Sequence, residues 1–324
     1  MVSDIEDNDE DVKFGSGRLL KDLISFANCK DSHRKIVLIG DYAQLPPVGQ
    51  NFSPALPEEY LREEYGLTVQ TAMLTSVIRQ AADSGIYKSA DAIRKSIDAK
   101  LYNQFGLVNS TDVIPFSSEE FISRYNEAKI MDGEDEVMII APSNAQAMDY
   151  NEVIRCNKYG ARNLSVQVGD ALLITHNNYL QKNVLFNGSF VRVHSVCNET
   201  ETLNAFVGEE RIVLRFRSVE VLINGAPFTY YILDDFLTER EGRLSQKMRK
   251  ALWANFTQRM REENITPKME EFKMRKRTDP YLNALHCKYG YAITCHKSQG
   301  GEWKNVFVDM NVWMGRMCES FFRW

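Results

Sequence analysis

The sequence predicts an α/β fold in which a small β-rich domain interrupts a parallel sheet. Two short apolar runs, at 35–41 and 137–141, are each followed by a polar loop and then by apolar residues at helical spacing. A strand, a polar loop and a helix in this order are typical of parallel sheets. Between residues 165 and 233 the pattern changes to β-type runs broken by Asn-Gly at 187–188 and 224–225. Asn-Gly between apolar runs predicts β-hairpins.

The same patterns place the other elements along the chain. Residues 4–17 are acidic and contain glycine, which predicts a loop. Helices are expected where apolar residues recur at helical spacing, at 18–28, near Pro57, at 85–101 and from 144 to 154. Strands of the parallel sheet are expected at the apolar runs 35–40, 137–141, 291–294 and 306–309.

Five short β-type runs predict that the inserted domain is a small barrel, at 171–175, 189–196, 211–216, 220–223 and 229–233. Its aromatic residues Tyr179, Phe186 and Phe190 are expected in the core. The alternative is that they are platforms on which the bases of a single strand stack. Residues 239–278 then show a charged helical pattern, which predicts a helical arm.

The composition predicts a soluble protein of two or three compact units. The chain has 324 residues, of which 44% are hydrophobic and 26% charged, as in ordinary globular domains. The apolar runs are strand-sized, well below the ~20 residues of a membrane helix, and no secretory signal is evident. The six cysteines lack disulfide spacing and fit a reducing compartment. We therefore expect a cytoplasmic protein with no membrane partner.

Charge is unevenly distributed along the chain, whose net charge is −5. Six of the first twelve residues are acidic, whereas residues 239–278 carry twelve Lys or Arg against six Glu. A basic arm of this kind can follow a phosphate backbone. It can equally be the solvated face of a helix, and the sequence leaves both interpretations open.

The sharpest motif follows the first apolar run and reads Gly40-Asp41-Tyr42-Ala43-Gln44-Leu45-Pro46-Pro47-Val48-Gly49. The prolines stiffen a loop at the carboxyl end of a predicted strand, where ligands of open α/β sheets bind. The amide of Gln44 offers a donor and an acceptor for a phosphate oxygen or a water. A stiff surface loop with an exposed glutamine is the alternative. The whole string resembles motif III of superfamily 1 helicases, in the form of the RecD/Dda-like branch.

This resemblance implies roles for the residues of the string. Gly40, Asp41 and Gln44 would lie at the nucleotide, with Gln44 in a catalytic role. Pro46 and Pro47 would lie at the DNA.

A second string, Leu74-Thr75-Ser76-Val77-Ile78-Arg79-Gln80, resembles motif IV of the same helicases. The resemblance implies that Arg79 reaches the γ-phosphate from the second RecA-like domain and acts in catalysis. An arginine suits this task because it is permanently charged and its fork of donors matches phosphate oxygens. An ordinary surface arginine is the alternative.

A third string, 291–303, contains Thr294-Cys295-His296-Lys297-Ser298-Gln299-Gly300-Gly301-Glu302 and resembles motif V. The resemblance implies that Thr294, His296 and Lys297 face the DNA backbone. It places Gly300 at the nucleotide phosphates and Glu302 near the ribose. Hydroxyls and cations position phosphates, and glycine permits a close approach of the backbone. An amphipathic turn from strand to helix is the alternative.

Two shorter segments extend the resemblance. Residues 139–144, continuing to Asn151, resemble the nucleic-acid-contacting loop between motifs IV and V, in which Ser143 and Asn144 would bind phosphates. Asn187-Gly188-Ser189 resembles a turn of the family's barrel. An acid more often follows that glycine, so no role is assigned to Ser189.

The resemblance implies a RecA-like, P-loop NTPase-type parallel sheet, with one partial and one nearly complete domain. Residues 1–72 would be the remainder of the first RecA-like domain and 73–164 the first part of the second. The small β-barrel would be inserted at 165–235 and the charged helical arm at 236–280. Residues 281–324 would return to the second RecA-like domain with motif V.

Several motifs of the family do not occur in the sequence. No Gly-x-x-x-x-Gly-Lys-Ser/Thr is present, and Gly15-Ser16-Gly17-Arg18 lacks the Lys-Ser/Thr pair that holds phosphates. In relatives Asp-Glu-x-Ser-Met precedes motif III, and Met1 matches its last residue. An arginine motif would follow a stretch like that ending at Trp324. We therefore expect a C-terminal fragment of a longer protein.

The resemblance implies a parent protein that hydrolyses ATP with Mg²⁺ and moves 5′ to 3′ along single-stranded DNA. The chain itself is expected to be inactive as an ATPase and to bind no nucleotide tightly. One alternative is a non-catalytic DNA-binding or scaffold protein that keeps the motor fold. Another is the helicase part of a nuclease or relaxase, or a translocase that does not unwind duplexes.

Two adjacent pairs, His286-Cys287 and Cys295-His296, raise the question of a metal site. Neighbouring residues of a strand point to opposite faces, so each pair can offer one ligand to a common metal. The spacing matches no zinc finger. We expect buried cysteines and hydrogen-bonded histidines here, and no metal.

Overall fold

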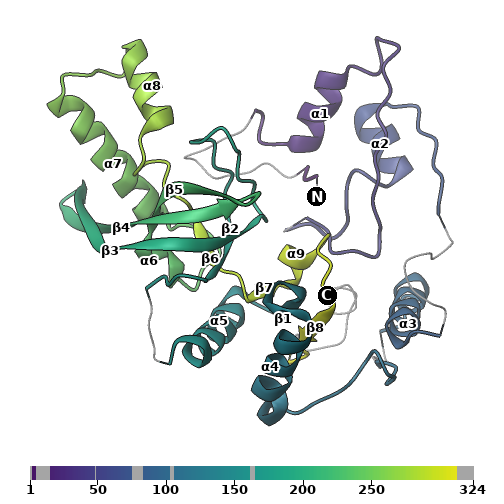
Figure 1. Cartoon of the computed structure of the whole chain (residues 1–324). Coiled ribbons are helices and arrows are strands. Elements are labelled where there is room, and N and C mark those ends of the chain that lie inside the picture. The colour runs from purple at the N-terminus through teal and green to yellow at the C-terminus, as the bar shows by residue number, and fades with distance from the viewer. Residues whose placement is uncertain are drawn as a thin grey trace. The chain divides into compact units, whose positions relative to one another are not determined.

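The computed structural model describes residues 2–4, 15–47, 49–74, 83–102, 106–160 and 165–311. These residues form two compact units, one extending to Ser117 and one beginning at Ser118. Figure 1 shows the helices and strands of both. No helix in these ranges has the length and apolar character needed to cross a membrane.

The described part of the first unit contains three helices, α1 (Leu19–Ala27), α2 (Glu58–Tyr65) and α3 (Gly85–Ala99). Leu20 and Ile24 of α1 pack with Leu61 of α2. The two helices end at Asn28 and Gly66, both with left-handed backbone, which is a common way to end a helix. Apolar side chains at helical spacing therefore form the helices that the pattern predicts at 18–28 and after Pro57.

Asp4, at the start of the predicted acidic loop, is buried in the first unit. Its carboxylate accepts hydrogen bonds from the hydroxyls of Tyr60 and Tyr65, each at 2.5 Å, and from the guanidinium of Arg18 at 3.2 Å. These donors offset the cost of burying a charge. The described residues of the predicted loop, 4 and 15–17, form no helix or strand, as predicted, and residues 5–14 lie outside the described residues.

The apolar run at 35–41 is not a strand, which corrects the prediction. Ile36 and Leu38 pack against the α1–α2 core, whereas Val37 and Ile39 are 80% and 92% exposed. No described segment pairs with this run in a sheet. A strand needs the backbone groups of a neighbour, and an apolar sequence alone does not supply them.

The second unit contains the predicted parallel sheet. β1 (Val137–Ala141) lies between β7 (Ala292–Thr294) and β8 (Asn305–Val308), and both pairs run parallel. α4 (Phe121–Asp132) and α5 (Asn144–Tyr159) contact β1, while the short turns η1 (Ser118–Glu120) and η2 (Glu134–Glu136) precede α4 and β1. The α/β prediction is confirmed for this unit.

An antiparallel sheet forms the other layer of the second unit. Its strands are β2 (Ala171–Ile174), β3 (Phe190–Val207), β4 (Glu210–Ile223), β5 (Ala226–Leu233) and β6 (Cys287–Tyr289), in the order β5-β4-β3-β2-β6. The turn from β4 to β5 is the predicted Asn-Gly hairpin, with positive φ at both Asn224 (51°) and Gly225 (79°).

The described strands do not close into the predicted barrel. β5 and β6 are the edges of the sheet, and an isolated bridge joins Ile232 of β5 to Leu285, which precedes β6. Runs predicted as separate short strands belong to two long ones, since 189–196 lies in β3 except for its first residue, and both 211–216 and 220–223 lie in β4. The outer halves of β3 and β4 pair with each other, beyond the reach of β2 and β5.

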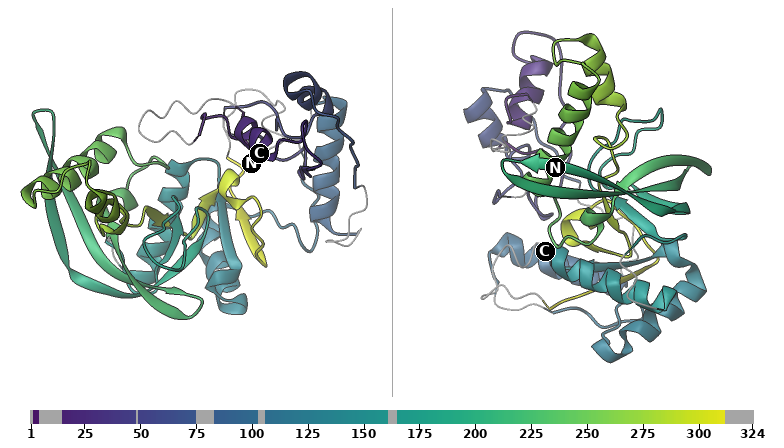
Figure 2. Two further views of the ribbon diagram at one scale, coloured as in Figure 1. Left: turned by 90° about the horizontal axis from the view of Figure 1, so that it is seen from above. Right: turned by 90° about the vertical axis from the view of Figure 1, so that its left-hand side faces the viewer.

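The predicted arm contains helices. α6 (Asp234–Leu237), α7 (Gln246–Glu262) and α8 (Glu270–Thr278) follow β5. α7 begins after Ser245, whose side chain accepts a hydrogen bond from the backbone of Met248, as an N-cap does. α7 packs on β3, and Figure 2 shows it alongside the long β3–β4 hairpin.

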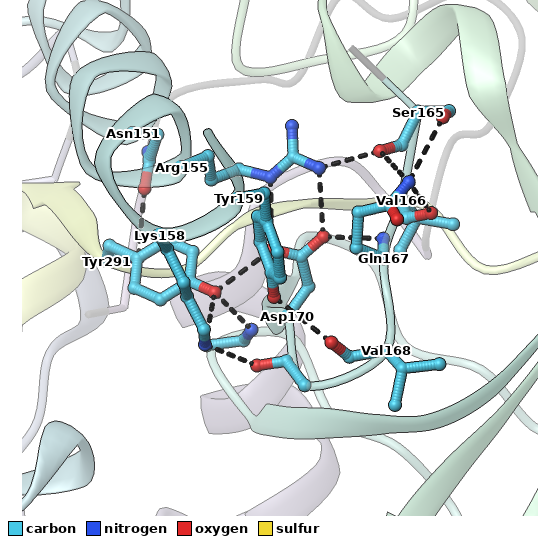
Figure 3. Close-up of polar contacts among 12 residues, drawn as sticks. Asn151, Arg155, Lys158, Tyr159, Ser165, Val166, Gln167, Val168, Asp170 and Tyr291 are labelled. Atoms are coloured by element: carbon cyan, nitrogen blue, oxygen red, sulfur yellow. Dashed lines mark hydrogen bonds and ion pairs between the residues drawn. The ribbon is translucent and has the colours of Figure 1, made fainter. Parts of the chain in front are cut away.

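A buried ion pair joins α5 to the antiparallel sheet (Figure 3). Arg155 on α5 donates two hydrogen bonds of 3.0 Å to the carboxylate of Asp170, and both side chains are nearly inaccessible. The hydroxyl of Tyr291 donates to the same carboxylate at 2.9 Å. The guanidinium of Arg155 lies 3.8 Å from the ring centroid of Tyr289. These contacts fix α5 relative to β2, β6 and β7.

Asn151 of α5 holds the start of β7. Its side-chain oxygen accepts hydrogen bonds from the backbone of Tyr291 and of Ala292, each at 2.9 Å, and its amide nitrogen donates to the carbonyl of Ala292 at 3.0 Å. The side chain is buried. Asn151 therefore positions β7, and its side chain is engaged inside the protein.

Candidate functional site

The carboxyl ends of β1 and β7 meet at one cleft. Ala141 and Thr294 are register partners in the parallel sheet, so the loops that leave both strands start side by side. Asn144, after β1, lines a cleft of about 50 Å³ together with Thr294 and Lys297. The structure thus brings together three of the residues that the sequence predicts at DNA, from segments far apart in the chain.

Ser143 and Asn144 form the start of α5. The hydroxyl of Ser143 accepts a hydrogen bond from the backbone of Gln146 at 3.1 Å, which caps the helix. Asn144 is exposed and lies against Gly242, where an added Cβ would be 2.8 Å from the side-chain nitrogen of Asn144. A glycine at 242 therefore allows the loop before α7 to approach Asn144 closely.

Lys297 is held at the rim of the cleft by Asn187, which the sequence predicts in a turn but not at the site. Its ammonium donates a hydrogen bond of 2.6 Å to the side-chain oxygen of Asn187. Burial lowers the pKa of Lys297, and the nearby cation Arg243 lowers it further. An anion that approached Lys297 and Arg243 would relieve this repulsion between like charges.

Lys288 of β6 fixes the loop that covers the cleft. Its ammonium donates hydrogen bonds to the carbonyl of Phe236 and, at 2.6 Å, to that of Glu239. Burial lowers the pKa of Lys288 to about 8. Sequence reasoning missed this residue, although a lysine within the mostly apolar run 284–294 is an available signal.

The aromatic residues of the antiparallel region are exposed, which corrects the prediction that they fill a core. Tyr179, Phe186 and Phe190 are 66%, 58% and 42% exposed. They lie in or next to the connection between β2 and β3, outside the buried face of the sheet. The hydroxyl of Tyr179 accepts a hydrogen bond from Asn177, whose side-chain oxygen accepts one from the backbone of Asn187. Exposed aromatic rings therefore stand near the turn that holds Lys297.

The remaining motif V residues do not line this cleft. His296, Gly300 and Glu302 are exposed on the segment that follows β7. Gly300 has a φ of 86°, in the left-handed region that glycine enters without strain, and the space beside its Cα is open.

The loop at 40–47 of the first unit is a turn closed by an ion pair. The carboxylate of Asp41 accepts two hydrogen bonds from Arg94, at 3.0 and 2.7 Å, and one from the backbone of Ala43 at 2.9 Å. This partner raises the pKa of Arg94. The Asp41 carboxylate is therefore engaged within the unit.

The other predicted residues of this loop are placed by the same turn. Gln44 is exposed and its backbone nitrogen donates to the carbonyl of Asp41 at 3.2 Å. Pro47 is buried and Pro46 half-buried. An added Cβ at Gly40 would lie 2.8 Å from Leu56, so the glycine permits close packing. Arg79 lies outside the described residues.

The histidine and cysteine pairs do not converge. Within the described ranges, no three His, Cys, Asp or Glu side chains are grouped in a way that could hold a metal ion. Cys287 is buried, which raises the pKa of its thiol to about 12. His286 packs edge-on against His176, with 5.0 Å between ring centroids.

A second cleft, of about 350 Å³, opens at the other edge of the parallel sheet. It is lined by Val137 at the start of β1, by Arg192 of β3 and by Trp303 before β8, among other residues. None of the residues that the helicase resemblance places at DNA or nucleotide lines it, but Phe190, the possible stacking platform, does.

Comparison with known proteins bears on the segment that carries β7 and the cleft. Residues 289–324 match the protein family described as UvrD-like helicase C-terminal domain. This match supports a superfamily 1 helicase. The matched segment includes Thr294 and Lys297, so two of the three predicted cleft residues fall inside it.

A viral protein is similar to most of the chain. "Uncharacterized protein R530" of Acanthamoeba polyphaga mimivirus is 24% identical over 320 residues, an alignment that covers 85% of this chain. The chain spans 63% of that relative's length.

Proposed function

We propose that the chain is part of an ATP-dependent DNA helicase or translocase of the RecD/Dda-like branch, and that the cleft of Asn144, Thr294 and Lys297 holds the backbone of single-stranded DNA. The observation that carries the proposal is the pairing of β1 with β7. It gathers an amide, a hydroxyl and an ammonium at one cleft, and the hydroxyl of Thr294 and the ammonium of Lys297 lie within the segment similar to helicases. Groups of these types position phosphates without reading sequence.

The surroundings of the cleft favour a single strand as the ligand. Tyr179 and Phe186 are exposed near the Asn187 turn, and aromatic rings stack unpaired bases of any sequence. Lys297 and Arg243 supply positive charge beside the cleft, which Glu239 and Glu241 also line. Ser143 and His296, at the same edge of the sheet, would add contacts to neighbouring phosphates.

The nucleotide would bind mainly outside the described residues. Gly40, Asp41, Gln44, Gly300 and Glu302 would contribute to its site, and Arg79 would reach the γ-phosphate. Asp41 already pairs with Arg94, so it would shape the loop and leave Gln44 to face the nucleotide. Because no phosphate-binding Gly-x-x-x-x-Gly-Lys-Ser/Thr occurs in the sequence, we propose that this chain alone does not hydrolyse ATP with Mg²⁺.

Titration of fluorescently labelled oligothymidine, read by anisotropy, tests the cleft. Lys297→Ala is expected to weaken binding several-fold and to reduce the slope of log K against log salt by about 0.7, the loss of one phosphate contact. Lys304→Ala is the matched control, since this lysine precedes β8 at the other edge of the sheet. Equal binding by both variants and the unaltered chain would rule out the cleft as the site.

DNA-stimulated ATP hydrolysis tests the catalytic part. The chain alone is expected to show no turnover above background. Turnover that is abolished by Gln44→Ala would contradict this expectation. DNA binding without turnover, also in the longer parent protein, would instead favour a non-catalytic DNA-binding protein that keeps the motor fold.

A further inference from the structure

The arm formed by α7 and α8 presents an exposed tryptophan beside its packed interior. Phe256 and Met260 of α7 pack with Phe272 of α8 and with Ile265 between the helices. Trp253 lies at the margin of this cluster, 6.2 Å from Phe272 and 5.6 Å from Phe256 between ring centroids. Even so, 41% of its surface is exposed. The indole therefore rests against the cluster with part of its surface and is exposed over another part.

The same arm carries cations that no carboxylate neutralises. Residues 246–278 contain ten Lys or Arg and four Glu. Lys247, Lys273 and Arg275 pair with Glu210, Glu270 and Glu263. Five exposed cations of the arm have no such ion pair with any described residue, namely Lys250, Arg261, Lys268, Lys276 and Arg277. The arm therefore carries a surplus of unpaired positive charge.

The exposed indole lies among these unpaired cations. The ammonium of Lys276 on α8 is 5.1 Å from the ring centroid of Trp253. On α7, Lys250 precedes Trp253 by three residues, which places both side chains on one face. Thr257 and Arg261 continue this face at intervals of four residues. Lys250, Trp253, Arg261 and Lys276 together make up what we call the arm face.

We propose that the arm face is a second contact surface for single-stranded nucleic acid, in which Trp253 stacks on a base and the cations meet the flanking phosphates. The proposal rests on the proposed function, since it extends the path of the strand beyond the Lys297 cleft. An exposed ring flanked by cations matches the alternation of base and phosphate along a single strand. In a duplex the bases are stacked on each other and would offer the indole no face.

Oligothymidine binding by the full chain tests the arm face with two independent variants. Trp253→Ala is expected to weaken binding at least about fivefold, while Trp253→Phe retains most of it because phenylalanine still stacks. The double variant Lys250→Gln/Lys276→Gln is expected to reduce the slope of log K against log salt by about 1.4, for two phosphate contacts. The matched control, Lys247→Gln/Lys273→Gln, removes the same charge from paired lysines and should leave the slope unchanged.

The possible outcomes separate this proposal from the proposed function. If Lys297→Ala weakens binding but the arm variants bind like the unaltered chain, the arm face does not contact the strand and the cleft remains the proposed site. If the arm variants weaken binding and Lys297→Ala does not, the proposal that the cleft binds single-stranded DNA is wrong. Equal losses on duplex DNA and on oligothymidine would overturn the stacking role of Trp253. Polyglutamate and an unlabelled oligonucleotide of equal charge can each compete with labelled oligothymidine. If polyglutamate competes as strongly as the oligonucleotide, the ligand is an acidic protein and the proposal of nucleic acid is overturned.

Discussion

The run at 35–41 and strand β1 carry the same local signal but take different structures. Each is a short apolar stretch that leads into a polar loop. β1 is buried between two parallel strands, whereas Val37 and Ile39 are exposed and no described segment pairs with them. The comparison shows that an apolar run indicates only the capacity to form a strand. Neighbouring strands decide whether that capacity is used.

The loops that follow the two runs differ accordingly. After β1, Ser143 caps α5 and Asn144 reaches a cleft shared with β7. After residue 40, Asp41 is engaged by Arg94 and closes a local turn. A polar residue at the end of an apolar run therefore joins a shared site only where a second strand brings another loop beside it.

The largest expected effect concerns the ion pair that joins α5 to the antiparallel sheet. Asp170→Asn leaves the buried guanidinium of Arg155 without its counter-ion and should lower the free energy of unfolding by about 3–5 kcal/mol. Urea unfolding followed by circular dichroism measures the change. A loss below about 1 kcal/mol, the range of an exposed pair, would mean that this pair does not hold α5 in place.

A matched pair of truncations sharpens the comparison between the two runs. Ile139→Ala removes a side chain that is 1% exposed in β1 and should cost about 2–5 kcal/mol of unfolding free energy. Ile39→Ala removes one that is 92% exposed and should change it by less than about 0.5 kcal/mol. Similar losses in the two variants would show that the run at 35–41 is also buried.

Much of the second unit could be predicted from sequence because its signals are local. The apolar run of β1, the polar cap at Ser143 and the Asn224-Gly225 hairpin each follow from a few neighbouring residues. The open sheet could not be predicted, since the pairing of the outer halves of β3 and β4 depends on strand length. The exposure of Tyr179 and Phe186 likewise depends on where the connection from β2 to β3 runs.

The candidate site was predictable in part for the same reason. Thr294, Lys297 and Asn144 were recognised from motifs, but their meeting at one cleft depends on the register of β1 and β7. The contacts of Asn187 with Lys297 and of Lys288 with the loop at 239 arise from segments far apart in sequence. No local pattern marks such contacts.

An intermediate effect is expected from Lys288. Burial lowers its pKa to about 8, below the value of about 10.4 in an unfolded chain. Between these two pH values the unfolded chain binds the proton and the folded chain does not, so the free energy of unfolding rises with pH. Relative to Lys288→Met, the unaltered chain should gain about 1–2 kcal/mol between pH 7.5 and pH 10. Urea unfolding at several pH values measures this gain. If the free energy of unfolding changed with pH in the same way for both proteins, the lowered pKa of Lys288 would be wrong.

The smallest effect is expected at the loop of the first unit. Asp41→Asn breaks a partly exposed ion pair with Arg94 and should lower the free energy of unfolding by about 1 kcal/mol or less. The loss should be smaller at high salt, because salt screens exposed charges. Thermal unfolding at low and high salt measures it. If Asp41→Asn lowered the free energy of unfolding as much as Asp170→Asn does, the ion pair of this loop would matter as much for stability as the buried pair of the second unit.

The most direct test of the central claim is amide hydrogen exchange of the full chain with and without oligothymidine. We predict that the oligonucleotide slows exchange at 143–147, 187–188 and 294–299, the segments around the cleft at the carboxyl ends of β1 and β7. Residues 134–137 and 303–305, at the other edge of the sheet, should exchange unchanged. Protection confined to that other edge, or saturating binding without protection at the cleft, would contradict the account.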